Sequence, residues 1–204
     1  MSRIAGLVLA AGESSRMGRD KALLEYRGVT FLEIILAQLR QAELSPIAVV
    51  LGHHAAEIQQ QTQLSGVEVV TNPEYLLGQT SSLQAGLRII QGSGADGVLL
   101  CLVDHPAVGA EVVRALAAKF RQTNAPVVIP VHNGQRGHPI VIGRTLFAEL
   151  MSLGPGVGAN TVIQKYHAAA QWLECEDSAV TLDVDTPEDY RRLQGEKSQR
   201  SGLR

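Results

Sequence analysis

Cysteine is scarce in this sequence, in which Cys101 and Cys175 are the only two cysteines among 204 residues. Two cysteines are too few for a disulfide scaffold, and their spacing matches no metal-ligand motif. Both lie in apolar segments, so we expect buried, reduced thiols.

Aromatic residues are few, and an excess of positive charge is absent. Phe, Trp and Tyr make up 4% of the chain, and 18 basic residues face 20 acidic ones, for a net charge of −2. Nucleic-acid binders show a basic excess, and single-strand binders add aromatic side chains on which bases stack. We therefore expect no nucleic-acid partner.

Long hydrophobic runs are absent as well. No apolar stretch approaches the roughly 18 residues that a membrane helix needs, so we expect no membrane association. The start of the chain, Arg3 followed by the apolar run 4–11, resembles a signal peptide but leads directly into polar residues 13–16. We interpret this run as a buried first strand and expect a cytoplasmic protein.

Hydrophobic residues make up 45% of the chain, which is ample for a core. The length is typical of one domain. We predict a single domain over residues 1–193 and a polar, flexible tail over residues 194–204. Residues 1–190 contain 13 basic and 19 acidic residues. Three of these cations, Arg16, Arg19 and Lys21, fall within six consecutive positions, so a short cationic stretch stands out in an acidic body.

Short apolar, β-branched runs alternate with amphipathic segments along the chain. The runs predicted to be strands are Ile4–Leu9, Ile47–Leu51, Val67–Thr71, Val98–Val103 and Val127–Val131. They are continuously apolar, as expected of parallel strands covered on both faces. The predicted helices between them are Thr30–Gln41, Ala55–Thr62, Ser81–Ile90 and Gly109–Phe120, the first opened by a capping box from Thr30 to Glu33. This order predicts a three-layer α/β/α, Rossmann-like fold with a mostly parallel sheet.

The second half of the chain is less regular and predicts a small antiparallel excursion. The pair Asn133-Gly134, typical of hairpin turns, precedes a short apolar run at Pro139–Ile142. A last strand is predicted at Ala179–Val184, and the pattern at Thr186–Asp189 predicts the start of a final helix.

The first predicted strand leads into a Gly-containing loop at residues 9–21, Leu-Ala-Ala-Gly-Glu-Ser-Ser-Arg-Met-Gly-Arg-Asp-Lys. In open α/β sheets, ligands bind beyond the carboxyl ends of the strands. Small residues at positions 10–12 allow close backbone approach, and Arg16 and Lys21 supply charge for a polyphosphate. The loop contains neither a Walker motif nor a dinucleotide-binding fingerprint. By composition alone, an ordinary turn with solvated cations explains it equally well.

The run Leu9–Lys21 closely resembles the signature of the MobA-like nucleotidyltransferases, a family that includes the molybdenum-cofactor nucleotidyltransferases. The resemblance covers roughly residues 4–190 and implies an enzyme whose loop wraps the triphosphate of a nucleoside triphosphate. Arg16 and Lys21 would be catalytic, with Arg16 on the β and γ phosphates and Lys21 at the α phosphate. The nucleotide-binding residues that the resemblance implies are Leu9, Ala10, Ala11, Gly12, Glu13, Ser14, Ser15, Gly18, Gly78, Gln79, Thr80, Ser81 and Ser82.

The segment Gly78–Ser82 precedes a predicted helix, where Ser and Thr side chains cap free amides or bind a polar ligand. It resembles the family's Gly-Met-Ser-Ser-Ser-Leu stretch, which lies by the base and ribose, with Gln79 in place of Met. From the residues themselves, simple helix capping is the alternative.

Two carboxylates are candidate Mg²⁺ ligands. Asp104 follows a predicted strand, and Mg²⁺ prefers carboxylate and phosphate oxygens. The family has a metal-binding Asp here, and its Asp-Ile-Asp-Thr-Pro-Glu-Asp stretch matches residues 183–189. In an extended strand conformation, Asp183 and Asp185 would point to the same face. We predict Asp104 and Asp185 as the metal ligands and Asp183 as a weaker choice, with turn or helix capping as the alternative role.

Residues 136–139, Arg-Gly-His-Pro, match a family stretch that lines the acceptor side. We therefore predict His138 as an acceptor-binding residue, with a structural loop histidine as the alternative. Many relatives have Gly-Asp-x-Gly-Ala-Arg in a later loop, whereas this chain has Gly158-Ala159-Asn160 and lacks the Arg.

The implied reaction is attack of an acceptor phosphate oxygen on the α phosphorus, with release of pyrophosphate. In the family, Ala-Gly-Gly at the loop start goes with guanylyl transfer and Ala-Ala-Gly with cytidylyl transfer; residues 10–12 here are Ala-Ala-Gly. The leading hypothesis is transfer of CMP from CTP to the molybdopterin (molybdenum) cofactor, with a molybdenum enzyme as a protein partner. The alternatives are a GTP-using enzyme, a nucleotidyltransferase for a sugar or alcohol phosphate, and a weakly catalytic protein that delivers the cofactor to a molybdenum hydroxylase.

Overall fold

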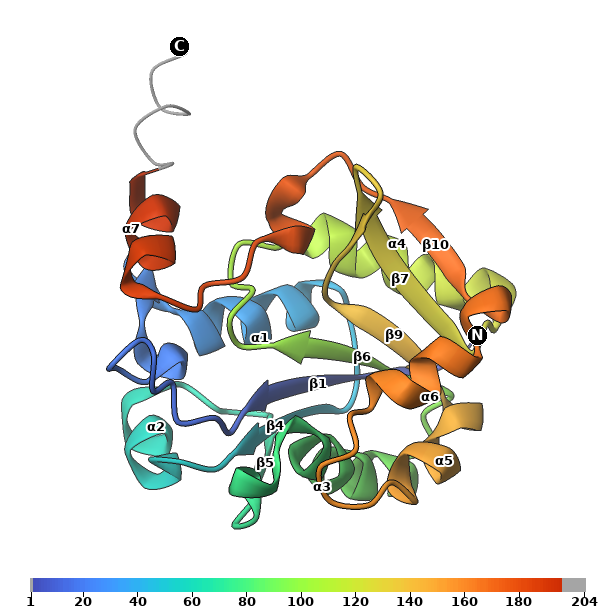
Figure 1. The fold of residues 1–204 in the computed structure, drawn as a ribbon, viewed down its shortest axis with the longest axis horizontal. Coiled ribbons are helices and arrows are strands. Elements are labelled where there is room, and N and C mark those ends of the chain that lie inside the picture. Colours follow the sequence, from blue (N-terminus) through green and yellow to red (C-terminus); the bar gives the residue numbers. More distant parts are fainter. Residues whose placement is uncertain (1, 196–204) are drawn as a thin grey trace.

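An eight-stranded sheet forms the centre of the molecule (Figure 1). The computed structural model describes residues 2–195. The strands of the sheet are β1 (Ile4–Ala10), β4 (Ile47–Leu51), β5 (Glu68–Thr71), β6 (Gly97–Leu102), β7 (Val127–His132), β8 (Gln135–Arg136), β9 (Ile140–Gly143) and β10 (Gln171–Glu174). Their order is β10-β7-β9-β6-β1-β4-β5, with β8 paired to β7, and β2 (Glu25–Tyr26) and β3 (Val29–Thr30) form a separate ribbon.

Most of the sheet is parallel. The pairs β1–β4, β1–β6, β4–β5 and β7–β10 are parallel, whereas β9 runs antiparallel to both β6 and β7. This arrangement confirms the predicted α/β class, a mostly parallel sheet with a small antiparallel part.

Helices cover both faces of the sheet and complete three layers (Figure 1). The α-helices are α1 (Phe31–Gln41), α2 (Ala55–Gln61), α3 (Gln79–Gly92), α4 (Ala110–Thr123), α5 (Phe147–Met151), α6 (Asn160–Lys165) and α7 (Pro187–Gly195). The 3-10 helices are η1 (Lys21–Leu23), η2 (Tyr75–Leu77), η3 (Arg144–Leu146), η4 (His167–Ala169) and η5 (Ser178–Thr181). Where a predicted helix or strand is present in the structure, each of its ends lies within three residues of the predicted end.

Alternation along β1 explains why its sequence is apolar throughout. Ile4 and Val8 pack into the core under α1 and α4, whereas Leu7 and Leu9 pack into the core under α3 and α5. All seven residues of β1 are buried, so both faces of the strand need apolar side chains. The interpretation of this run as a buried first strand is confirmed.

The local turn and cap signals are confirmed as well. The Thr30 hydroxyl oxygen accepts a hydrogen bond from the Glu33 amide at 3.3 Å at the start of α1. Asn133 and Gly134 both have positive φ, 49° and 76°, in the turn between β7 and β8, as a type I′ hairpin requires. The Asp189 amide donates to the Thr186 hydroxyl at 3.2 Å at the start of α7.

The predicted last strand, Ala179–Val184, is wrong. Residues Ser178–Thr181 form η5, and the edge position beside β7 is taken by β10 instead. The apolar residues Val180 and Val184 are buried because this segment packs across the carboxyl ends of the strands, not because it joins the ladder. As a result Asp183 and Asp185 do not share a strand face, and Asp183 is exposed.

The predicted tail, residues 194–204, falls almost entirely outside the described residues, and the single-domain division at residue 193 stays a prediction. Among residues 2–195, no helix has the length and hydrophobicity to cross a bilayer.

Candidate active site

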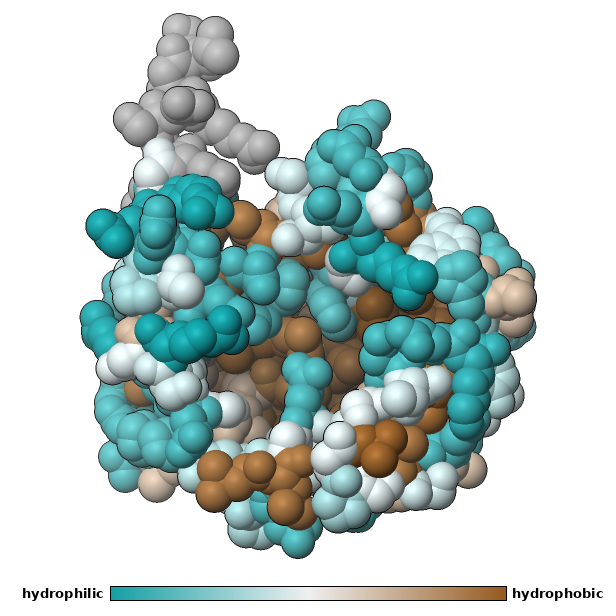
Figure 2. Space-filling model, viewed as in Figure 1, coloured by the Kyte–Doolittle hydropathy of each residue, from teal (hydrophilic) through white to brown (hydrophobic). Residues whose placement is uncertain are grey.

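A cleft of about 310 Å³ opens beyond the carboxyl ends of β1 and β6. The space-filling view shows a hollow at the centre of the face in view, with apolar residues inside it (Figure 2). The cleft is lined by Leu9, Ala10, Ala11, Gly12, Ser14, Ser15, Arg16, Asp20, Lys21, Tyr75, Gly78, Gln79, Ser82, Leu102, Val103, Asp104 and Asp185. Most of the residues predicted to bind the nucleotide and the metal are therefore brought to one place.

The loop after β1 is folded around Ser14. The Ser14 carbonyl oxygen accepts from the amides of Met17 and Gly18 at 2.9 and 3.1 Å, and its hydroxyl oxygen accepts from the Lys21 amide at 3.1 Å. Ser14 itself has a φ of 51°, a left-handed conformation that lets the chain turn back sharply. These bonds place Arg16 and Lys21 over the cleft.

Lys21 is the centre of the charged groups in the cleft. Its Nζ lies 2.5 Å from Asp185 Oδ1 and 3.2 Å from Asp104 Oδ2, and its side chain is only 12% exposed. Arg16 Nη2 lies 2.7 Å from Asp185 Oδ2. The two predicted catalytic cations and the two predicted metal ligands thus form one network, although 164 positions separate Lys21 from Asp185.

Main-chain hydrogen bonds explain why these distant residues meet. The Val103 amide donates to the Leu9 carbonyl at 3.1 Å, and the Val184 amide donates to the Asp104 carbonyl at 2.9 Å. The first bond aligns the ends of β1 and β6, and the second holds the segment that carries Asp185 against Asp104. The carboxylates are therefore positioned by backbone contacts at the carboxyl edge of the sheet.

The electrostatics of the cleft keep Asp185 ionised. The hydrogen bond from Lys21 lowers the pKa of the Asp185 carboxyl below its ordinary value, and the charge of Arg16 acts in the same direction against the opposing effect of burial. Asp185 therefore carries its full charge at neutral pH, the form that binds cations.

The carboxylates present fit a divalent cation. Asp104 Oδ1 is buried and has no hydrogen-bond partner within residues 2–195, so one oxygen of this carboxylate is free to act as a ligand. Asp185, which shares the ammonium group of Lys21 with Asp104, adds a second carboxylate. Carboxylate oxygens are the donors that Mg²⁺ and Mn²⁺ prefer, and a bound divalent ion would supply neutralisation of phosphate charge.

The residues at the start of α3 differ in their contacts: some line the cleft, and others hydrogen-bond to neighbouring segments. Gly78, with a φ of 101°, Gln79 and Ser82 line the cleft. The Ser81 hydroxyl donates to the Glu74 carbonyl at 2.9 Å, and the Thr80 hydroxyl accepts from the Ala159 amide at 3.1 Å, so both side chains have structural partners.

Glu13 and Gly18 belong to the loop but not to the lining of the cleft. The nucleotide-binding roles predicted for these two residues, for Thr80 and Ser81, and for the residues that do line the cleft, stay predictions.

A second pocket, of about 390 Å³, adjoins the cleft and shares Leu9, Gly78 and Gln79 with it. Its other lining residues are mostly apolar: Leu77, Thr80, Leu83, Leu100, Ile129, Arg136, Gly137, His138, Ile140, Gly156, Val157, Gly158, Ala159, Asn160 and Ile163. The segment predicted to line the acceptor side, 136–139, therefore meets the loop that contains Gly158, Ala159 and Asn160 at this pocket.

Gly137 is required by a close approach in the wall of this pocket. A Cβ at this position would lie 2.2 Å from the Val180 carbonyl oxygen, far inside contact distance. The same carbonyl accepts a hydrogen bond from the His138 amide at 2.8 Å. The segment that carries Asp185 and the segment that carries His138 are thus locked together.

His138 and His105 form a partly buried imidazole pair between the pocket and Asp104. Their ring centroids lie 5.2 Å apart, and His105 Nε2 lies 3.8 Å from Asp104 Oδ1. Burial lowers the pKa of His138 to about 4, with a further contribution from His105, and burial also lowers the pKa of His105. Both rings are therefore neutral at physiological pH and able to donate or accept hydrogen bonds.

We expect His138→Gln to flatten the dependence of stability on pH. Because the pKa of His138 is about 4 in the folded chain and 6.5 ordinarily, the unfolded chain binds a proton between these pH values that the folded chain does not. Stability therefore falls as the pH drops from about 6.5 to about 4, and glutamine removes this contribution. Denaturant unfolding across the range measures the slope. His167→Gln, at an exposed histidine, is the matched control; equal slopes in both variants would contradict the assignment.

Sequence reasoning missed several residues of the cleft. Tyr75 and Leu102 line it, and so does Asp20, whose side chain is only 6% exposed. The position of Asp20 next to Lys21 in the cationic loop was the one available signal. Tyr75 offered none, because its place depends on how η2 packs against Gly52, in the turn after β4.

The fold and the cleft define a class of protein, the nucleotidyltransferases of the Rossmann-like fold. The chain belongs to one family within that class, the MobA-like NTP transferase domain, whose model matches residues 6–172. The predicted family is thus confirmed, and the chain is an enzyme of the nucleotidyltransferase type.

Curated relatives match along nearly the whole chain. A probable molybdenum cofactor guanylyltransferase of Mycobacterium avium is 33% identical, covering 94% of this chain and 95% of its own. The molybdenum cofactor cytidylyltransferase of Escherichia coli is 28% identical, covering 93% and 95%. Nicotine blue oxidoreductase of Paenarthrobacter nicotinovorans is 29% identical, covering 93% and 96%.

Solved structures of similar proteins also match along nearly the whole chain. The crystal structure of Rv0371c from Mycobacterium tuberculosis is 31% identical to this chain with a TM-score of 0.83, covering 95% of this chain and 98% of that one. The same protein has also been solved as a manganese complex, with a TM-score of 0.74 and coverage of 95% and 99%.

Proposed function

We propose that this protein transfers CMP from CTP to the molybdopterin (molybdenum) cofactor in a Mg²⁺-dependent reaction that releases pyrophosphate. The observation that carries the proposal is that Lys21, the last residue of the loop that resembles a triphosphate-binding signature, lies between Asp104 and Asp185. The proposal keeps the expected cytoplasmic location, and a molybdenum enzyme is the expected protein partner.

The charges of the cleft suit a triphosphate and a divalent ion together. Arg16 is 71% exposed, so it has the freedom to leave Asp185 and bind the β and γ phosphates. Lys21 is held deeper, where it is positioned to neutralise charge at the α phosphate. Asp104 and Asp185 would hold the divalent ion, because their oxygens face the same space that the phosphates would enter.

The chemistry needs no nucleophile from the protein. A phosphate oxygen of the acceptor attacks the α phosphorus, one phosphorus–oxygen bond forms, and the bond to the leaving pyrophosphate breaks. Because the attacking phosphate is already ionised, no strong general base is required. The residues of this chain contribute positioning and charge stabilisation.

The second pocket supports an acceptor with an apolar or aromatic portion. Leu83, Ile129 and Ile140 line it, beside the polar groups of Arg136 and the neutral His138. Molybdopterin combines a pterin ring system with a phosphate, and the phosphate would point toward the cleft that adjoins this pocket. A simple sugar or alcohol phosphate would leave the apolar wall without a contact.

The choice of CTP rests on Ala11. Ala11 lines the cleft and is 4% exposed, and the amide of His53 donates to its carbonyl oxygen at 3.2 Å, so its methyl group is fixed in the wall. A methyl group here, where guanylyltransferases have Gly, narrows the space for a purine. The relatives are named for both nucleotides, so this one position carries the choice.

We expect isothermal titration with Mg²⁺ to show tighter binding of CTP than of GTP. Ala11→Gly is the matched variant: removing one methyl group widens the wall and shifts the preference toward GTP. Arg19→Ala, in the same loop but outside the cleft lining, serves as the control. A clear preference of the wild-type protein for GTP would sink the cytidylyl assignment.

A redox activity is the second candidate, because a relative of nearly the same length is named an oxidoreductase and the second pocket is largely apolar.

A cofactor-delivery role is the third candidate, since Asn160 stands where many relatives have Arg. Release of pyrophosphate from CTP and molybdopterin favours the transferase. Binding of molybdopterin without any pyrophosphate release favours delivery.

A further inference from the structure

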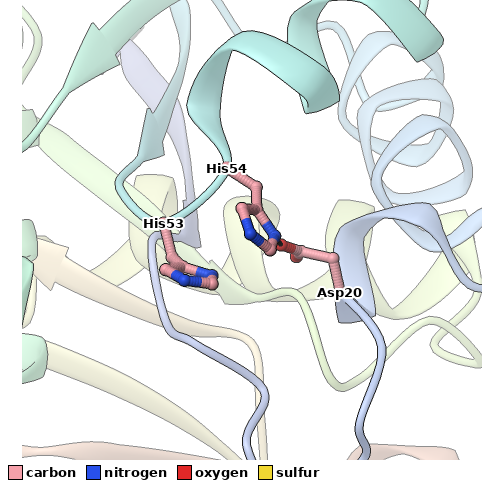
Figure 3. Close-up of side chains that lie close together, drawn as sticks. All are labelled: Asp20, His53 and His54. Atoms are coloured by element: carbon pink, nitrogen blue, oxygen red, sulfur yellow. Dashed lines mark ion pairs between the residues drawn. The ribbon is translucent and has the colours of Figure 1, made fainter.

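Asp20, His53 and His54 form a cluster of potential metal ligands beside the phosphate loop (Figure 3). Asp20 lies immediately before η1, His53 lies in the turn after β4, and His54 is the N-terminal cap of α2. One potential ligand atom from each residue lies within 4.8 Å of the other two. This cluster is separate from the Asp104–Asp185 pair and contains different donor types.

Two polar atoms of the cluster are buried without a hydrogen-bond partner among residues 2–195. These atoms are Asp20 Oδ2 and His53 Nδ1. The Asp20 side chain is 6% exposed, and its Oδ2 lies 3.4 Å from His54 Nδ1, without hydrogen-bond geometry. Burial raises the pKa of Asp20, against the opposing effects of the Ala22 amide and of the two histidines. A buried carboxylate oxygen without a partner costs stability unless a cation or a donor satisfies it.

The two imidazole rings are held close to each other. Their centroids lie 3.7 Å apart with planes tilted by 41°, and Figure 3 shows both rings beside the Asp20 carboxylate. His54 adopts a left-handed backbone conformation, with a φ of 52°, which costs free energy in a residue with a Cβ. The ring of His53 also packs against Tyr75, at 6.0 Å between centroids.

The donor set selects the kind of ion. Two imidazole nitrogens and one carboxylate oxygen suit Zn²⁺ and similar transition metals, whereas Mg²⁺ prefers oxygen ligands alone. The donor atoms around a tetrahedral zinc ion lie about 3.3 Å apart. Small rotations of the three side chains would bring their ligand atoms from the present arrangement to that separation. The His54 side chain is 52% exposed, so an ion can reach the cluster from solvent.

We propose that Asp20, His53 and His54 bind a Zn²⁺-class divalent metal at a second cation site, which ties the phosphate loop to the turn between β4 and α2. Asp20 belongs to the loop end next to Lys21, and the His53 amide already donates to the Ala11 carbonyl at 3.2 Å. The metal would add a second tie between the same two segments. Three protein ligands leave at least one coordination position for water.

The test is titration of the full-length, untagged protein with ZnCl₂ in excess Mg²⁺, followed by calorimetry, and with Co²⁺, followed by visible absorption. We expect one Zn²⁺ per chain, a raised midpoint of thermal unfolding, and a Co²⁺ spectrum of a site with nitrogen ligands. His53→Gln and His54→Gly each weaken Zn²⁺ affinity by about tenfold or more. Glycine is chosen at position 54 because it accepts the positive φ.

Two controls separate this site from the others. His167→Gln removes an exposed histidine elsewhere and leaves Zn²⁺ binding unchanged, and so does Asp104→Asn, which alters the Asp104–Asp185 pair. Absence of Zn²⁺ binding to the wild-type protein would overturn the proposal. So would binding that survives both histidine substitutions but is lost in Asp104→Asn, because the metal would then lie at the carboxylate pair. Thermal unfolding without metal verifies that each variant is folded.

Discussion

Lys21→Ala is expected to lower kcat/KM for nucleotidyl transfer by about 10²- to 10³-fold, or about 3–4 kcal/mol of transition-state stabilisation. The ammonium group of Lys21 lies in hydrogen-bond range of both Asp104 and Asp185 and is nearly buried. When a triphosphate enters the cleft, the same group is positioned to meet the charge that develops at the α phosphate. Alanine removes this charge and also leaves the two carboxylates without their shared cation.

Steady-state pyrophosphate release, with CTP, Mg²⁺ and molybdopterin, measures the effect of Lys21→Ala. Arg19→Ala is the matched control, because Arg19 is an exposed cation of the same loop that does not line the cleft. We expect this control to retain activity within about twofold of wild type. Activity of Lys21→Ala close to that of Arg19→Ala would show that Lys21 has no part in the chemistry.

Asp185→Asn is expected to reduce activity by about 10²-fold or more and to raise the Mg²⁺ concentration that half-maximal activity requires. Asparagine has nearly the same shape but no charge, so it loses its ion pairs with Arg16 and Lys21 and becomes a poorer metal ligand. Asp183→Asn, two residues away and exposed, is the matched control and leaves both quantities near wild type. The reverse result would make Asp183 the ligand.

Asp185→Asn is also expected to change how the unfolding free energy depends on pH. The lowered pKa of Asp185 means that its ionised form stabilises the fold at pH values above the ordinary value of 3.8. This contribution is lost as the pH falls through the lower pKa of the folded chain. The difference in unfolding free energy between wild type and Asp185→Asn is therefore present at neutral pH and disappears in strong acid. A difference that persists in strong acid would point to packing and not to charge.

Elements whose signals are local were predictable from the sequence. The apolar runs of β1 and β4 have to be covered on both faces, and Thr30, Asn133 and Gly134 act on residues only two or three positions away. Such signals do not depend on the rest of the chain, so the fold class and most element positions followed from them. The loop at residues 9–21 was recognisable for the same reason, because its motif is contiguous.

The prediction of a last strand at residues 179–184 failed because strand pairing depends on residues far away in the sequence. Residues 179–184 are apolar enough for a strand, but a strand needs an available partner, and the edge of β7 pairs with Gln171–Glu174 instead. That competition is decided by how η5 packs over the Gly137 backbone, where the Val180 carbonyl leaves no room for a side chain. No pattern within the segment itself records this contact.

By itself, the sequence determined the family, the parallel α/β architecture and the residue types that meet a triphosphate, because these depend on contiguous motifs and on hydrophobic periodicity. Only the tertiary structure decided that Lys21 joins Asp104 to Asp185, that His105 and His138 form a neutral pair, and that Asp20 faces two histidines. Each of these arrangements brings together side chains from different loops at the carboxyl edge of one sheet. Their energies come from burial and short distances between charges, and neither exists until the strands are aligned.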